Sequence, residues 1–161
     1  MVEVGEIAPD FTLEGAHEQE VREFTLSEFA GQKPTALVFY VYDYSPVCTT
    51  QMCEVNDMEF LTFNDDVSVL GISTDGPYSH REFASDNGLT YPLLSDPQMK
   101  LYREYGLTEK DENGDDQAKR GVVLLVSDRT VQYRWEANDN WDEWRIDPLN
   151  EMNDIVDSLL G

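Results

Sequence analysis

The chain of 161 residues is long enough for one domain with a full hydrophobic core and too short for two, so we expect residues 1–161 to form a single domain. Its 33 Asp and Glu residues outnumber 11 Lys and Arg residues, which gives a formal net charge of −22. This surplus argues against nucleic acid and anionic membrane surfaces as partners, because proteins bind both through clustered Lys and Arg side chains.

The same charge suggests where the protein works. An apolar content of 40% with 3 Trp, 8 Tyr and 7 Phe is too high for a disordered chain. We therefore interpret the carboxylates as the coat of a folded, halophilic protein in a high-salt cytoplasm, where cations screen them; an acidic mesophilic protein is the alternative. The N-terminus has no signal-peptide pattern and no stretch reaches the length of a membrane span, so we expect a cytoplasmic location.

The first third of the chain predicts a hairpin, a strand and a helix. Residues 10–15 and 21–31 have the pattern of short strands or a β-hairpin, and residues 35–42 (TALVFYVY) form a β-branched and aromatic run typical of a buried central strand. Apolar residues then recur at roughly helical spacing over residues 46–63. Ser45 is the expected N-cap of this helix, and the proline after it is the expected first helical residue.

The middle of the chain continues the alternation. Residues 67–74 (VSVLGIST) predict a second buried strand, and residues 77–88 predict a helix that ends at a glycine. Residues 91–96 (YPLLSD) follow as a short strand, and residues 98–106 predict another helix that also ends at a glycine.

The last third predicts two strands and a closing helix. Residues 121–127 and 130–137 form two apolar runs around a turn, and residues 147–161 predict an amphipathic helix. The acidic segment 111–116 lacks the bidentate Glu of a calcium loop and is expected to be a solvated loop. Together the elements predict an α/β fold with a central mixed β-sheet covered by helices on both faces, preceded by the N-terminal β-hairpin.

Both cysteines of the chain, Cys48 and Cys53, fall in the first two turns of the predicted helix 46–63. Unpaired backbone N–H groups and the helix dipole stabilise a thiolate in the first turn, so Cys48 is the better nucleophile. Cys53 lies about 7.5 Å further along the helix axis and roughly 140° around it. Because a disulfide needs Cα atoms within about 7 Å and convergent side chains, we expect the pair to bond only after this part of the helix unravels.

Other interpretations of the cysteine pair stay open. Both residues could be ordinary small buried side chains. A zinc or copper site would need further ligands, and the only histidines, His17 and His80, stand at no ligand spacing from the cysteines. A Cys–His hydrolase or transferase would need one of the same histidines as its base. We expect His80 on the surface of the helix 77–88.

The segment VYDYSPVC (41–48) resembles the active-site pattern P-x-x-x-(T/S)-x-x-C of the peroxiredoxins, the alkyl hydroperoxide reductase/thiol-specific antioxidant family. Ser45 and Cys48 take their places in this pattern, and Val41 stands where the family has proline. The spacing of Cys48 and Cys53 is similar to that of the PrxQ or bacterioferritin comigratory protein type. The segments GEIAPDFTL, LGISTD and YPLLSD extend the resemblance over nearly the whole chain, which implies a thioredoxin-like fold.

The resemblance also implies an activity. Cys48 would be the peroxidatic cysteine that reduces hydrogen peroxide or an organic hydroperoxide, and Cys53 would resolve its sulfenic acid as an intramolecular disulfide. A thioredoxin-like protein would then reduce the disulfide. Arg120 matches the family's late arginine and, with Ser45, would stabilise the thiolate and hold the peroxide. No metal, haem or flavin is implied, and the protein would be a monomer or a homodimer. The arginines ranked below Arg120 are Arg81, Arg129, Arg134 and Arg145.

Two different functions remain as alternatives to a peroxidase. One is a thioredoxin-fold thiol-disulfide oxidoreductase, although such enzymes usually carry C-x-x-C, and the other is a non-enzymatic redox sensor or holdase. Within the peroxidase hypothesis, Val41 still supplies an apolar wall, but it restores a backbone N–H and frees φ. We expect this difference to affect the catalytic rate more than the type of reaction.

Overall fold

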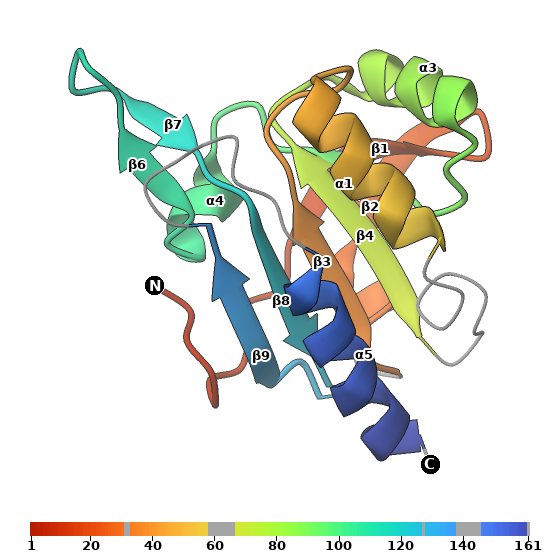
Figure 1. Cartoon of the computed structure of the whole chain (residues 1–161), viewed down its shortest axis with the longest axis vertical. Coiled ribbons are helices and arrows are strands. Elements are labelled where there is room, and N and C mark those ends of the chain that lie inside the picture. Colours follow the sequence, from red (N-terminus) through yellow and green to blue (C-terminus); the bar gives the residue numbers. More distant parts are fainter. Residues whose placement is uncertain (31–32, 58–66, 127, 138–145, 161) are drawn as a thin grey trace.

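A seven-stranded mixed β-sheet runs through the centre of the molecule (Figure 1). The computed structural model describes residues 1–30, 33–57, 67–126, 128–137 and 146–160. The strand order is β2-β1-β5-β4-β3-β8-β9; β3, β4 and β5 are parallel, and β1 and β8 are antiparallel to their neighbours in this group. The strands are β1 (Thr12–His17), β2 (Glu20–Thr25), β3 (Thr35–Phe39), β4 (Ser68–Ser73), β5 (Leu93–Ser95), β8 (Gly121–Leu125) and β9 (Val131–Glu136).

Helices cover both faces of this sheet, as the sequence predicted. Because side chains alternate along a strand, Ala36 and Val38 of β3 pack on one face, and Leu37 and Phe39 pack on the other. The first face also receives apolar side chains of α1, α3 and α5, and the second receives those of α4 (Figure 1). The helices are α1 (Pro46–Asp57), α3 (Pro77–Asn87), α4 (Lys100–Glu104) and α5 (Asp147–Leu160).

The expected N-terminal hairpin is present, and β1 pairs with β2 along its whole length. After β2 a single 3-10 turn, η1 (Leu26–Glu28), shortens the second predicted strand. The central strand also ends earlier than predicted: β3 stops at Phe39, where its antiparallel partner β8 begins at Gly121. The part of the predicted first helix beyond residue 57 lies outside the described residues.

A second hairpin, β6 (Thr108–Lys110) with β7 (Asp116–Ala118), was not predicted. The acidic segment 111–116 forms its turn, which is largely exposed, and ends at Asp116, the first residue of β7. Asp111 Oδ1 accepts the backbone N–H groups of Asn113 and Asp115 at 2.8 and 2.9 Å, which is how a short carboxylate side chain stabilises a turn. The carboxylates of this loop therefore serve a solvated turn, in line with the sequence-based expectation.

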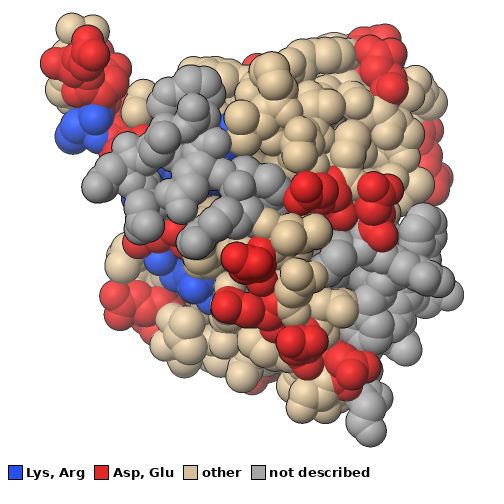
Figure 2. Space-filling model, viewed as in Figure 1, with Lys and Arg blue, Asp and Glu red and all other residues tan. Residues whose placement is uncertain are grey.

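Acidic side chains are spread over the face of the molecule seen in Figure 2, whereas basic side chains form only small patches there. The helix α5 contributes much of this charge, because its solvent side carries Asp147, Glu151, Asp154 and Asp157. Among the described residues, no helix is long and apolar enough to cross a membrane.

Candidate active site

The loop between β3 and α1 delivers Cys48 to the start of a helix. The helix begins at Pro46, and the carbonyl oxygen of Ser45 accepts the N–H of Thr49 at 2.7 Å. The Ser45 hydroxyl faces the backbone N–H of Cys48 at 3.5 Å, the position of an N-cap side chain. Cys48 therefore lies in the first turn, where the helix dipole favours a negative charge.

The Cys48 thiol is fully buried between two hydrogen-bond donors. Arg120 Nη1 lies 2.8 Å from Cys48 Sγ, and the backbone N–H of Tyr42 points at the same sulfur from 3.4 Å. Two donors, one of them cationic, suit a sulfur that carries negative charge. Val41 is nearly buried, precedes Tyr42 in the chain and belongs to the same apolar cluster as Cys48.

Arg120 reaches Cys48 because of the register of two strands. It precedes Gly121, which pairs with Phe39 at the end of β3, so the arginine lies beside the loop that leads to Cys48. Its guanidinium is fully buried, and Nη1 also donates to Gln51 Oε1 at 2.9 Å. Within the described part of the chain, Arg120 pairs with no carboxylate, and Nε and Nη2 have no hydrogen-bond partner. The site therefore holds a buried cation whose Nε and Nη2 donors are not used by any described residue.

Cys53 lies on the same helix in different surroundings. It is partly exposed, and its Sγ lies 3.8 Å from Asn87 Oδ1 at the end of α3. Burial raises the pKa of the Cys53 thiol, and the negative charge of Asp57 raises that pKa further. Both cysteines are free thiols in one continuous helix, Pro46–Asp57, as expected for a pair that cannot bond while the helix is intact.

The position predicted for His80 is wrong. This histidine is fully buried, and its ring contacts Asp43 in the loop before α1. The sequence-based expectation failed because α3 turns one side toward the sheet, where polar groups of β4, of β5 and of the segment between β3 and α1 surround the imidazole. The second histidine, His17, is exposed in part and lies at the β1–β2 turn, where its Nε2 is 3.0 Å from the backbone oxygen of Thr90.

The other arginines have structural contacts away from Cys48. Arg81 is half exposed on α3 beside Glu82, Arg129 donates to the Ala8 carbonyl, and Arg134 donates to the Tyr105 carbonyl. Arg145 lies outside the described residues.

Sequence reasoning missed Gln51 and the N–H of Tyr42. Gln51 is fully buried; its Nε2 donates to the Phe39 carbonyl at 3.1 Å, which turns its Oε1 toward Arg120. The spacing contained a signal, because Gln51 stands three residues after Cys48 and shares its helix face. The sequence contains no signal that identifies the backbone N–H of Tyr42 as a donor to Cys48.

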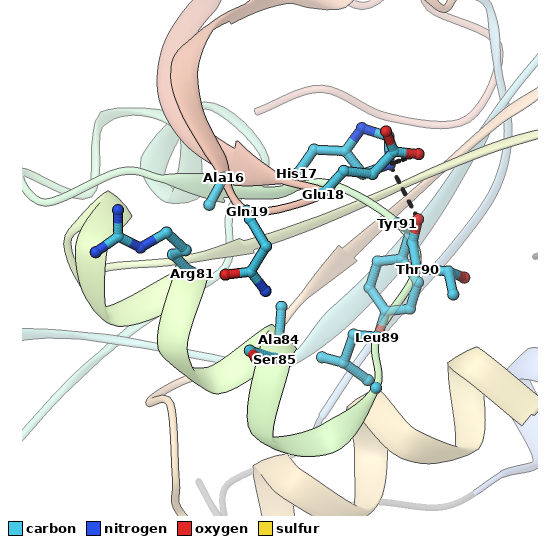
Figure 3. A pocket seen from close by; sticks show the side chains of 11 residues that line it. Ala16, His17, Glu18, Gln19, Arg81, Ala84, Ser85, Leu89, Thr90 and Tyr91 are labelled. Carbon is cyan, nitrogen blue, oxygen red and sulfur yellow. Dashed lines mark hydrogen bonds and ion pairs between the residues drawn. The ribbon is translucent and has the colours of Figure 1, made fainter.

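A groove with a volume of about 290 Å³ lies between the β1–β2 turn and α3 (Figure 3). His17, Gln19, Arg81 and Ser85 line it with polar groups, and neither cysteine does. Tyr91 also lines the groove, while its hydroxyl donates to the carbonyl of Met52 at 2.7 Å. The groove is therefore separate from the thiol site, although one of its residues anchors the helix just before Cys53. Among the described residues, no cluster of three His, Cys, Asp or Glu side chains is placed to hold a metal ion.

Comparisons with known proteins identify the family of this chain. Residues 4–134 match the AhpC/TSA family. The chain is 40% identical over 106 residues to a chloroplastic peroxiredoxin Q of Gentiana triflora, an alignment that covers 66% of this chain and 47% of that protein. It is 36% identical over 135 residues to alkyl hydroperoxide reductase E of Mycobacterium bovis, covering 83% of this chain and 84% of that protein.

Solved structures show the same fold. Peroxidoxin BcpB of Mycobacterium tuberculosis superposes with a TM-score of 0.82 at 24% identity, covering 99% of each chain. A PrxQ variant of Xylella fastidiosa superposes with a TM-score of 0.81 at 20% identity, covering 100% of this chain and 99% of that one. The predicted thioredoxin-like fold is thereby confirmed. The chain spans about half the length of the first curated relatives that it matches. By the family match and these relatives, the chain belongs to the AhpC/TSA family, the peroxiredoxins.

Proposed function

We propose that this protein is a thiol peroxidase of the PrxQ type that reduces hydrogen peroxide and organic hydroperoxides. The observation that carries the proposal is the contact of 2.8 Å between Arg120 Nη1 and Cys48 Sγ inside a fully buried site. A buried guanidinium needs a counter-charge. Since no described carboxylate pairs with Arg120, a Cys48 thiolate is the anion that satisfies it.

In the first step the Cys48 thiolate attacks the terminal oxygen of the hydroperoxide. An S–O bond forms as the O–O bond breaks, Cys48 becomes a sulfenic acid, and the leaving oxygen takes a proton to depart as water or an alcohol. The unpartnered Nε and Nη2 donors of Arg120 and the hydroxyl of Ser45 are the groups proposed to hold the peroxide oxygens during the attack.

In the second step the first turns of α1 unravel and Cys53 attacks the sulfenic sulfur. An S–S bond forms, the S–O bond breaks, and water leaves. A thioredoxin-like protein then reduces the disulfide by thiol–disulfide exchange. This chemistry uses thiols alone, and two free cysteines suit a reducing compartment such as the cytoplasm.

Single-turnover measurements on three proteins test the assignment of the two cysteines. With one equivalent of hydrogen peroxide, we expect the wild type to lose two hydrogen atoms as a disulfide forms within one chain. Cys48→Ser should consume no peroxide, and Cys53→Ser should complete one turnover and stop at a sulfenic or more oxidised Cys48. Intact-mass spectrometry distinguishes these products and separates an intrachain disulfide from one between two chains of a homodimer.

Steady-state kinetics separate the peroxidase from the alternatives. An oxidoreductase or a redox sensor need not turn over peroxide when thioredoxin and its reductase are supplied, whereas a peroxidase must. Equal loss of the first turnover in Cys48→Ser and Cys53→Ser would sink the assignment.

We also infer that the acidic coat is an adaptation to high salt. At low ionic strength the net charge of −22 repels itself, and salt cations screen that repulsion. Thermal unfolding followed by circular dichroism should show a melting temperature that falls by several degrees or more between molar and millimolar potassium chloride. A melting temperature independent of salt would contradict the inference.

A further inference from the structure

His80 on α3 is a buried titratable group that the proposed cycle leaves unused. Its Nδ1 lies 2.8 Å from Asp43 Oδ2 and 3.1 Å from Tyr40 Oη. Its Nε2 lies 3.0 Å from the backbone oxygen of Leu94 and 3.5 Å from Ser73 Oγ. One ring therefore joins α3 to β4, to β5, to the end of β3 and to the loop before α1.

The acceptors around the ring indicate where its protons lie. The Asp43 carboxylate already accepts the hydroxyl hydrogens of Tyr40 at 2.6 Å and Ser79 at 2.7 Å, so it acts as an acceptor throughout. The Leu94 carbonyl can only accept as well. A proton on Nδ1 therefore donates to the Asp43 carboxylate, and this contact fixes the two buried side chains to each other.

A second carboxylate, that of Asp75, lies near this group in the loop after β4. Asp75 Oδ2 accepts the backbone N–H of Asp43 at 2.6 Å and the hydroxyl of Ser73 at 3.3 Å. Asp43 is therefore held through its side chain by His80, Tyr40 and Ser79, and through its backbone N–H by Asp75.

The two chain neighbours of Asp43, Tyr42 and Tyr44, have conformations that matter for the thiol site. Its neighbour Tyr42 points its N–H at Cys48 Sγ from 3.4 Å. Its other neighbour, Tyr44, has φ +66°, a left-handed conformation that is unfavourable for a residue with a side chain and persists only where the surroundings enforce it. Release of Asp43 would let this strained loop relax and withdraw the Tyr42 N–H from the sulfur.

We propose that Asp43 and His80 are a pair of positioning residues, which hold the loop before α1 so that the Tyr42 N–H stays on the Cys48 sulfur. The pair touches neither the sulfur nor the peroxide and acts through the loop. This inference rests on the proposed peroxidatic role of Cys48, and it adds two residues of the described chain to the machinery that prepares the thiolate.

The test is the rate of the first step alone, measured by stopped-flow fluorescence in a Cys53→Ser background. Asp43→Asn and His80→Gln should each slow the reaction with hydrogen peroxide about tenfold, the usual effect of losing a hydrogen bond to a charged group. Thiolate absorbance in the far ultraviolet should fall with the rate. His80→Asn, whose amide N–H can take the place of Nδ1–H, should recover part of the rate, and His17→Asn is the matched control with no change expected.

The double variant Asp43→Asn/His80→Gln shows whether the two residues act as a unit. If they do, its rate equals that of the slower single variant, since the second change removes nothing further. Full rate and thiolate absorbance in folded His80→Gln would overturn the proposal, and so would additive losses. If the Cys53→Ser parent itself consumes no peroxide, the proposed function fails instead.

Nitrogen NMR of the reduced wild type tests the pair without any change to it. His17→Asn leaves one histidine, which assigns the His80 ring signals. Nδ1 should have the chemical shift and proton coupling of an N–H nitrogen, because it donates to Asp43. An Nδ1 without a bonded proton would overturn the proposed contact with Asp43 even if the variants fail to fold.

Discussion

Cys48 and Cys53 are the same residue type on one helix, but the charged group near Cys48 is a cation and the one near Cys53 is an anion. Cys48 is buried against the guanidinium of Arg120 and a backbone N–H, both of which favour a thiolate. Cys53, on α1, lies beside the end of α3. There, burial and the carboxylate of Asp57 raise the pKa of its thiol and favour the protonated form. The order of the proposed chemistry therefore depends on what each sulfur faces.

The comparison also indicates how Cys53 becomes reactive. The two causes of its raised pKa, burial and the nearby charge of Asp57, belong to the intact helix. When α1 unravels, Cys53 gains water and moves away from Asp57, so its pKa falls toward the ordinary value for cysteine. The same motion that allows the disulfide thus supplies the thiolate that forms it.

Removal of the cation at Cys48 should have the largest effect. Arg120→Met keeps much of the buried volume and deletes the charge beside the sulfur. We expect the first step to slow by on the order of 10²–10³-fold, as when a donor is removed from a site of developing charge. Stopped-flow kinetics with hydrogen peroxide measure this rate, and alkylation of Cys53 should be unchanged.

The matched control is Arg81→Met, which removes a half-exposed arginine of α3. It should react at the wild-type rate. If the first step in Arg120→Met is as fast as in the wild type, the charge of Arg120 does not account for the difference in reactivity between Cys48 and Cys53.

An intermediate effect is expected at the anchor before Cys53. Tyr91→Phe deletes the hydrogen bond of 2.7 Å to the Met52 carbonyl. Loss of such a bond costs about 1 kcal/mol, which changes the unravelling equilibrium of α1 about fivefold. Disulfide formation after sulfenic acid formation should accelerate by about that factor, while the first step stays unchanged.

Rapid-quench mass spectrometry follows the disulfide directly. Tyr78→Phe is the control, because Tyr78 is exposed on α3. Slower resolution in Tyr91→Phe would mean that the anchored half of the helix must stay in place for Cys53 to attack.

The smallest effect is expected from the charge next to Cys53. In a Cys48→Ser background, Asp57→Asn removes the second cause of the raised pKa of Cys53. Alkylation of Cys53 by iodoacetamide at a pH below that raised pKa should speed up roughly twofold, the size of an exposed charge interaction. Salt should reduce the difference between the two proteins, since it screens exposed charges. An unchanged alkylation rate would leave burial as the only cause.

Local signals made the first helix and its cysteines predictable. Ser45 and Pro46 mark the start of α1, and the positions of Cys48 and Cys53 on it follow from helix geometry alone. The hairpin β6–β7 escaped prediction because its three-residue strands, TEK and DQA, are mostly polar and lack the apolar run that made the equally short β5 (LLS) predictable.

Contacts between residues distant in the chain could not be predicted from local sequence patterns. Arg120 and Cys48 are 72 residues apart, and the resemblance to a family indicated the arginine; only the register of β8 against β3 brings the two together. Nothing in the sequence linked His80 with Asp43, 37 residues away, because a histidine in a helix has the same local pattern whether it is buried or exposed.

The sequence by itself determined the fold class, the helix start and the two thiols, since capping residues, apolar periodicity and spacing act within a few positions of the chain. The tertiary structure decided which thiol meets a cation and which meets a carboxylate. That decision required packing, because the charge that a sulfur experiences comes from groups that only the folded sheet and its loops bring within a few ångströms.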